Sequence, residues 1–122
     1  MANLTKQDIV LTGLNPSFSN AGGGGSGAGT DEILDNDGKT LLYVKNDNAG
    51  SIDVTITSEV TSKTITGYGS ATFSNVVVTI PAGEERAIGP FPKERFNDAN
   101  GEVTVSYDEI SSVTVAVLRL PV

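Results

Sequence analysis

Acidic side chains are the main candidates for chemistry in this chain. Six of them form two groups: Asp31, Glu32, Asp35 and Asp37, and then Glu84 and Glu85. Two carboxylates that face each other across a cleft can hydrolyse a glycosidic bond. Here the first group follows a glycine-rich segment and the second follows a Pro-Ala-Gly turn, and carboxylates in such places usually face solvent. We therefore expect solvated charge in both groups and no catalytic pair.

The segment 35–39 (Asp-Asn-Asp-Gly-Lys) has the closely spaced carboxylates and the glycine of part of a calcium loop. If its two aspartates and its glycine filled the third, fifth and sixth positions of an EF-hand, the first position would be Ile33 and the twelfth Val44. Neither can bind calcium, which excludes the standard loop. A turn in which Asp or Asn binds its own backbone suits the same residues. We predict that turn, with an accidental surface cation site as the alternative.

Composition argues against most other chemistry. The chain has no His and no Cys, so the most common general base, the most common metal ligand and the thiol nucleophile are missing. It has no Trp, and its three tyrosines (Tyr43, Tyr68 and Tyr107) are spread along the sequence, which disfavours an aromatic binding platform. We expect a protein that is not an enzyme and that needs no cofactor and no metal.

Net charge and hydropathy limit the partners. The formal charge is −7 and the basic residues are scattered, so nucleic acid and anionic membranes are poor partners. Residues 1–7 contain no apolar run of signal-peptide length, and no later stretch approaches the roughly 20 apolar residues of a membrane span. We expect synthesis in a cytoplasm.

The segment 20–30 is rich in glycine. Six glycines within residues 20–29 leave almost nothing to bury, so we predict a flexible loop that is either a tolerated insertion or a mobile contact. A phosphate-binding loop would lead directly into a helix and usually end in Lys-Ser or Lys-Thr. This one runs into Thr30, Asp31 and Glu32, whose carboxylates would repel phosphate.

The elements around these features are predicted to be strands. Alternating or β-branched apolar residues between turn signals predict seven of them, at 8–14, 40–46, 51–58, 73–80, 85–88, 102–107 and 113–120. The short polar turn at 46–50 predicts a hairpin between the second and third strands, and Pro81–Glu84 predicts another between the fourth and fifth. Residues 59–70 are predicted to be a loop with at most an edge strand. Phe91 and Phe96 are expected to close the end of the core.

These strands and the lack of any helical period predict an all-β fold. We expect one domain over residues 8–122, preceded by an arm at 1–7. An antiparallel β-sandwich or jelly roll of about seven to eight strands fits best, with the flexible Gly-rich loop at 20–30. A closed barrel is the alternative.

Three segments resemble those of small structural proteins of tailed-bacteriophage virions, typically capsid decoration (cement) proteins. They are 38–46 (GKTLLYVKN), 78–92 (VTIPAGEERAIGPFP) and 95–98 (RFND), and the likeness extends over roughly residues 38–120. The resemblance implies a β-rich module on the outside of an assembled shell, often a trimer at local three-fold positions. Its partner would be the major capsid protein.

The leading hypothesis is therefore a virion protein that stabilises a capsid by bridging its subunits. A neck or tail protein that forms a ring is the structural alternative, and a carbohydrate-binding module is the alternative of another class. Candidate contact surfaces are the arm at 1–7, the glycine loop at 22–29 and the corner at 90–96. We expect deletion of the arm to weaken capsid binding without unfolding the domain.

Overall fold

The computed structural model describes residues 2–120, so Met1 of the predicted arm and the last two residues of the predicted domain lie outside it. The chain is 45% strand and 6% helix, which confirms the all-β prediction. No helix in the described part of the chain is long and apolar enough to span a membrane. The strands are β1 (Ala2–Leu4), β2 (Lys6–Asp8), β3 (Ser19–Asn20), β4 (Gly29–Ile33), β5 (Thr40–Asn46), β6 (Ile52–Ile56), β7 (Ser62–Ile65), β8 (Gly69–Thr72), β9 (Val76–Ile80), β10 (Glu85–Ile88), β11 (Val103–Tyr107) and β12 (Val113–Arg119). A 3-10 turn, η1 (Ala21–Gly23), and a single helical turn, α1 (Lys93–Phe96), complete the fold.

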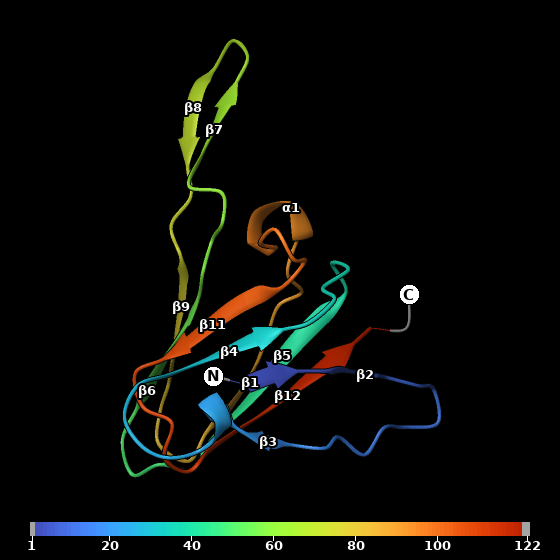
Figure 1. The fold of residues 1–122 in the computed structure, drawn as a ribbon, viewed down its shortest axis with the longest axis vertical. Helices are drawn as coiled ribbons and strands as arrows, with labels where there is room; N and C mark the ends of the chain where they lie inside the picture. Colours follow the sequence, from blue (N-terminus) through green and yellow to red (C-terminus); the bar gives the residue numbers. More distant parts are fainter. Residues whose placement is uncertain (1, 121–122) are drawn as a thin grey trace.

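The strands form two larger sheets and one separate hairpin (Figure 1). In the first sheet the order is β1-β4-β11-β6-β9, and in the second it is β10-β5-β12-β2, with β3 also paired to β12. Most neighbours are antiparallel, but β1 runs parallel to β4 and β2 runs parallel to β12. The third sheet contains only β7 and β8, which extend away from the rest of the chain at the top of Figure 1.

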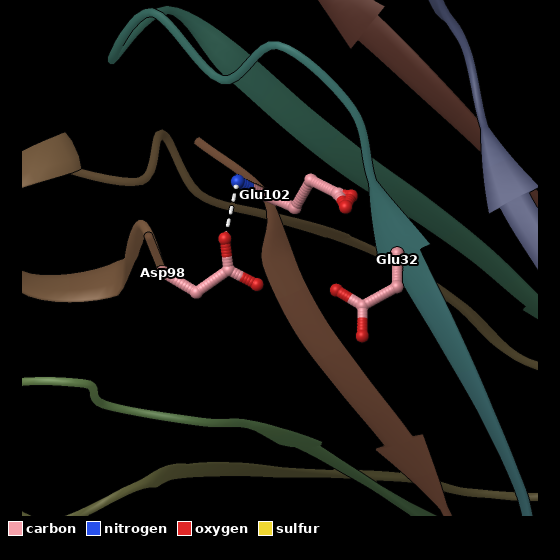
Figure 2. Close-up of side chains that lie close together, drawn as sticks. All are labelled: Glu32, Asp98 and Glu102. Carbon is pink, nitrogen blue, oxygen red and sulfur yellow. Dashed lines mark hydrogen bonds between the residues drawn. The ribbon is translucent and has the colours of Figure 1, made fainter. Parts of the chain in front are cut away.

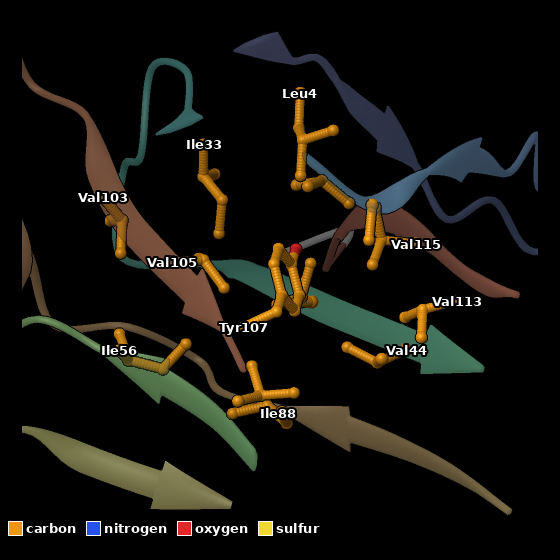
Figure 3. Packing of buried hydrophobic residues seen from close by; sticks show 14 of the residues in the cluster. Leu4, Ile33, Val44, Ile56, Ile88, Val103, Val105, Tyr107, Val113 and Val115 are labelled. Atoms are coloured by element: carbon orange, nitrogen blue, oxygen red, sulfur yellow. The ribbon is translucent and has the colours of Figure 1, made fainter. Parts of the chain in front are cut away.

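One hydrophobic core is shared by the two larger sheets. Alternate residues of β11 (Val103, Val105 and Tyr107) and of β12 (Val113, Val115 and Val117) are buried in it, as the period-two pattern predicts. Figure 3 shows side chains from both sheets meeting there. The two aromatic rings expected to close the core, Phe91 and Phe96, are 2% and 5% exposed and pack edge to face at 5.9 Å.

Both predicted hairpins are wrong, although their strands exist. β5 pairs with β10 and β12, whereas β6 pairs with β9 and β11 in the other sheet. The turn after β5 therefore crosses between the sheets, and the turn after β9 crosses back to β10. The buried Asn46 holds both crossings, because its amide donates to the carbonyl oxygens of Gly50 and Ile80, each at 3.0 Å. Alternation predicts which face a strand buries and leaves open which strand lies beside it.

The expected arm at 1–7 and the first strand at 8–14 are also corrected. Residues 2–4 form the edge strand β1, residues 6–8 form β2 in the second sheet, and residues 10–14 form no strand. Leu4 is 6% exposed and belongs to the core cluster. This segment thus contributes to both sheets. Strands as short as these, with one buried residue between them, carry no alternation that a sequence pattern can detect.

Four further strands were not predicted, including the two-residue β3. β4 follows the glycine-rich segment directly and has two charged residues among its five, so it lacks an apolar run. β7 and β8 form a hairpin where a loop with at most one edge strand was expected. Their side chains are exposed apart from the half-buried Ala71, so they show no alternation between buried and exposed positions.

Candidate functional site

The carboxylates at residues 31–37 are not all solvated as expected. Asp31 lies on β4 and is 0% exposed. Its Oδ2 accepts hydrogen bonds from the Tyr107 hydroxyl and from the Gly22 backbone N–H, both at 2.9 Å, and its Oδ1 accepts one from the Ala2 N–H at 3.2 Å. These donors come from β11, η1 and β1, so Asp31 joins three segments that are distant in sequence. It is a structural group enclosed by its donors.

A second acidic group lies on the outer side of the first sheet, where Glu32 of β4 comes close to Asp98 and Glu102 (Figure 2). One carboxylate oxygen from each lies within 4.8 Å of the others. Burial and the neighbouring charges of Asp98 and Glu102 raise the pKa of Glu32, while a hydrogen bond from Thr104 opposes this. Asp98 Oδ1 already accepts the N–H groups of Asn100 and Glu102. All three side chains are partly exposed, as acidic groups without an ion commonly are, and we assign no ion to them.

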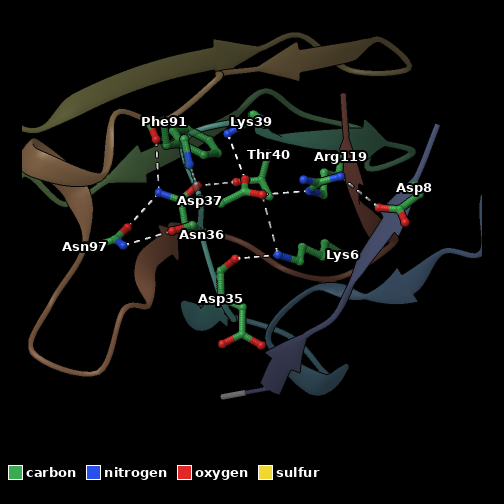
Figure 4. Close-up of polar contacts among 11 residues, drawn as sticks. Lys6, Asp8, Asp35, Asn36, Asp37, Lys39, Thr40, Phe91, Asn97 and Arg119 are labelled. Atoms are coloured by element: carbon green, nitrogen blue, oxygen red, sulfur yellow. Dashed lines mark hydrogen bonds and ion pairs between the residues drawn. The ribbon is translucent and has the colours of Figure 1, made fainter. Parts of the chain in front are cut away.

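The segment 35–39 forms the predicted turn (Figure 4). Asn36 Oδ1 accepts the N–H of Gly38 at 3.2 Å and Asp37 Oδ1 accepts the N–H of Lys39 at 3.0 Å, which is the local bonding expected of Asx turns. Asp37 Oδ2 accepts a hydrogen bond from Arg119 Nε at 2.7 Å, and this contact is the main reason that its pKa falls to about 2. The turn is thereby fixed to the end of β12.

The glycine-rich loop is also held at defined points. The carboxylate of Glu109 accepts the N–H of Gly27 at 2.7 Å, and the Ile110 N–H donates to the Gly27 carbonyl oxygen at 2.9 Å. A Cβ atom on Gly29 would lie 2.7 Å from Cγ2 of Ile110, so a glycine is needed where this side chain packs against the loop. The sequence pattern indicated the flexibility that glycine allows and could not indicate these distant contacts.

A further exposed feature of the described chain is the projecting hairpin, which we define as residues 59–75. β7 and β8 pair with each other and with no other strand among residues 2–120. Ile65 is 46% exposed, and Tyr68, between two glycines at the tip, is 89% exposed. A tyrosine that projects into solvent presents a large apolar ring with a polar end, which is the side-chain type often found at the centre of protein interfaces.

Arg95 fixes the base of this hairpin. Its guanidinium Nη2 donates to the Ser74 carbonyl oxygen at 2.8 Å and its Nε donates to Ser58 Oγ at 3.2 Å. The same group lies over the rings of Phe73 (5.3 Å) and Phe96 (4.8 Å). In addition, the backbone carbonyl of Arg95 accepts the N–H of Glu59 at 2.9 Å. The hairpin is therefore held at its base by one residue of α1.

The base of the projecting hairpin also borders an open cavity of about 270 Å³. Its lining is largely apolar and comes from both segments: Val60, Lys63 and Phe73 from the hairpin, and Pro92, Glu94 and Arg95 from the corner. The corner at 90–96, one of the three predicted contact surfaces, thus lies beside the base of the hairpin. The other two, the N-terminal segment and the glycine loop, meet each other at Asp31 instead. The signal that could have identified the hairpin is its low charge, since Lys63 is the one charged residue in its residues 60–75.

Comparisons with models of known protein families, with characterised proteins and with solved structures gave no significant match to this chain.

Proposed function

We propose that this chain is a structural protein of a tailed-bacteriophage virion, which binds the outer surface of the capsid and stabilises it by bridging major capsid protein subunits. It is made in the host cytoplasm and acts in the virion by binding alone, with no catalytic step. Several copies decorate one shell. The two sheets, in this proposal, form a β-sandwich of the jelly-roll kind, with the projecting hairpin as an addition that reaches a partner.

The observation that carries the proposal is the projecting hairpin. A two-stranded hairpin is at best marginally stable alone in water, because it buries little apolar surface. Here Ile65 and Tyr68 are left in solvent at its end while Arg95 fixes its base. Contact with a capsid subunit would bury these side chains, and a hairpin that is already ordered loses less conformational entropy on binding.

Charge supports the same surface. Residues 60–75 of the hairpin contain one charged residue, Lys63, so a chain of net charge −7 carries −8 on its remaining residues. Removing charged groups from water is costly, and interface centres are accordingly depleted of charge. The acidic remainder would face solvent, where like charges keep neighbouring decorated shells apart.

The experiment is a binding titration of purified protein against bare phage capsids, with the bound fraction measured after sedimentation. We compare the wild type with Tyr68→Ser and with Leu11→Ser. Leu11 is fully exposed on a different loop, so its substitution is a matched control for the loss of one exposed apolar side chain. We expect Tyr68→Ser to weaken binding about tenfold or more and Leu11→Ser to leave it unchanged.

Three results would contradict the proposal in different ways. Equal binding by all three proteins would show that the hairpin does not lie in the interface with the capsid. Failure of the wild type to bind shells, together with formation of larger rings, would favour a neck or tail protein. Sugar binding without shell binding would favour the carbohydrate-binding alternative.

A further inference from the structure

One edge strand lacks the features that protect sheet edges from pairing. β2 and β10 carry charged residues, and β1 and β3 have only three and two residues. β9 has five residues, Val-Val-Val-Thr-Ile, with no charge and no proline. It lies at the end of the first sheet, and its outward-facing Val77 is 57% exposed. An uncharged apolar edge of this kind presents unpaired backbone groups to another strand.

The inner face of β9 is incompletely covered as well. Val76 and Val78 pack against the core but are only half-buried, whereas Val103 and Val105 on the central strand β11 are fully buried. Beside Val76 lies an open cavity of about 220 Å³, which extends to Ile88 on β10 and to Phe91. The two sheets therefore leave an apolar gap between their edge strands β9 and β10.

A second copy of this chain is the occupant that fits this edge. Two molecules that each carry −7 repel one another over most of their surface, but residues 60–83 hold no negative charge. An uncharged strand is also complementary to itself, because an antiparallel pair about a two-fold axis uses the same backbone groups in both copies. The second β9 would lie beside the gap and extend the first sheet across it.

We propose that two copies of this chain associate through β9, paired antiparallel about a two-fold axis, so that the first sheets of both copies become one continuous sheet. This pairing goes beyond the proposed function and does not depend on it. It gives a closed dimer, which differs from the trimer that the resemblance implies. Binding to capsids and association in solution are measured separately, so either can fail alone.

The first test is the mass of the purified full chain by sedimentation equilibrium. We expect twice the 12.6 kDa of one chain for the wild type. Val77→Lys places a charge on the edge strand and should raise the dimer dissociation constant about tenfold or more. Ala87→Lys is the matched control, because Ala87 is an exposed position on β10, an edge strand of the second sheet. It should leave the mass unchanged.

A second variant keeps the test decisive if Val77→Lys alters folding. The chain has no cysteine, so Val77→Cys introduces a single thiol and Ala87→Cys provides the control. If the two-fold axis passes through Val78, the middle of β9, residue 77 of one copy lies opposite residue 79 of the other. Mixing Val77→Cys with Thr79→Cys under mild oxidation should then give disulfide-linked dimers, and Ala87→Cys should not. A monomeric or trimeric wild type, a dimer dissociation constant that Val77→Lys leaves unchanged, or equal cross-linking at residue 87 would each overturn the proposal.

Discussion

The hydroxyl of Tyr107 donates a hydrogen bond to Oδ2 of Asp31 at 2.9 Å in the buried interior, between residues 76 positions apart in sequence. Burial and the adjacent Asp31 carboxylate raise the pKa of Tyr107 far above its ordinary value, so the hydroxyl keeps its proton and remains a donor. Because Asp31 also accepts the N–H groups of Ala2 and Gly22, this one carboxylate ties the N-terminal strand and the glycine-rich loop to the first sheet.

Substitution of Asp31 should be among the most destabilising changes in the chain. Asp31→Ala leaves three donors without their acceptor and should lower the free energy of unfolding by about 2–4 kcal/mol. Tyr107→Phe removes one donor and should cost about 1–2 kcal/mol. Urea denaturation measures both, with the exposed Asp47→Ala as control. Equal stability of Asp31→Ala and Asp47→Ala would show that Asp31 is not a structural group.

Deletion of residues 1–7 should destabilise the fold, contrary to the expectation from sequence. The deletion removes β1, most of β2 and the buried side chain of Leu4. Loss of a buried leucine alone costs about 2–5 kcal/mol, so Leu4→Ala should reproduce much of the effect. Thermal unfolding followed by circular dichroism gives the measurement. An unchanged unfolding midpoint would show that residues 1–7 are a dispensable arm.

The sequence predicted strands far better than it predicted their neighbours. The range 40–46 matches β5, and the buried positions of β11 and β12 follow from alternation. The pairings at the turns after β5 and β9 were wrong because a sheet-to-sheet crossing and a hairpin use similar short polar turns. Asp31 was missed for a different reason, since its burial depends on donors from β1, η1 and β11 that no local pattern contains.

Arg95→Ala should loosen the projecting hairpin more than it destabilises the domain. The substitution removes the hydrogen bonds to Ser58 and Ser74 and the contacts with the rings of Phe73 and Phe96. Hydrogen exchange within residues 61–73 should become about tenfold faster, while exchange in β11 should change little. Arg95→Lys keeps the charge without the planar donor group and should give an intermediate rate. Unchanged exchange in the alanine variant would show that Arg95 does not anchor the hairpin.

Acid should destabilise the contact between Asp37 and Arg119. The pKa of Asp37 is lowered from 3.8 to about 2 in the fold, so its carboxylate stabilises the folded state above the higher value. That contribution is lost as the pH falls from about 4 to about 2, because protonation then favours unfolding. Asp37→Asn should flatten the pH dependence of stability in this window. A slope in the Asp37→Asn variant equal to that of the wild type would contradict this assignment.

The carboxylate of Glu32 should affect the pH dependence of stability in the opposite direction to that of Asp37. Its pKa is raised in the fold, mainly by burial, so the folded state binds the proton more tightly than the unfolded state does. Stability therefore falls as the pH rises through this pKa. Glu32→Gln removes the partly buried charge beside Asp98 and Glu102 and should raise the melting temperature by about 1–3 °C at pH 7, with no gain near pH 4. A gain that is independent of pH would point to packing instead of charge.

The proposed role on the virion is tested most directly by the ratio of bound protein to major capsid protein when bare capsids are saturated and sedimented. The proposal predicts that binding saturates at one fixed ratio and that decorated shells resist heat better than bare ones. Binding that rises without saturation, or saturation with no gain in shell stability, would contradict a protein that holds capsid subunits together.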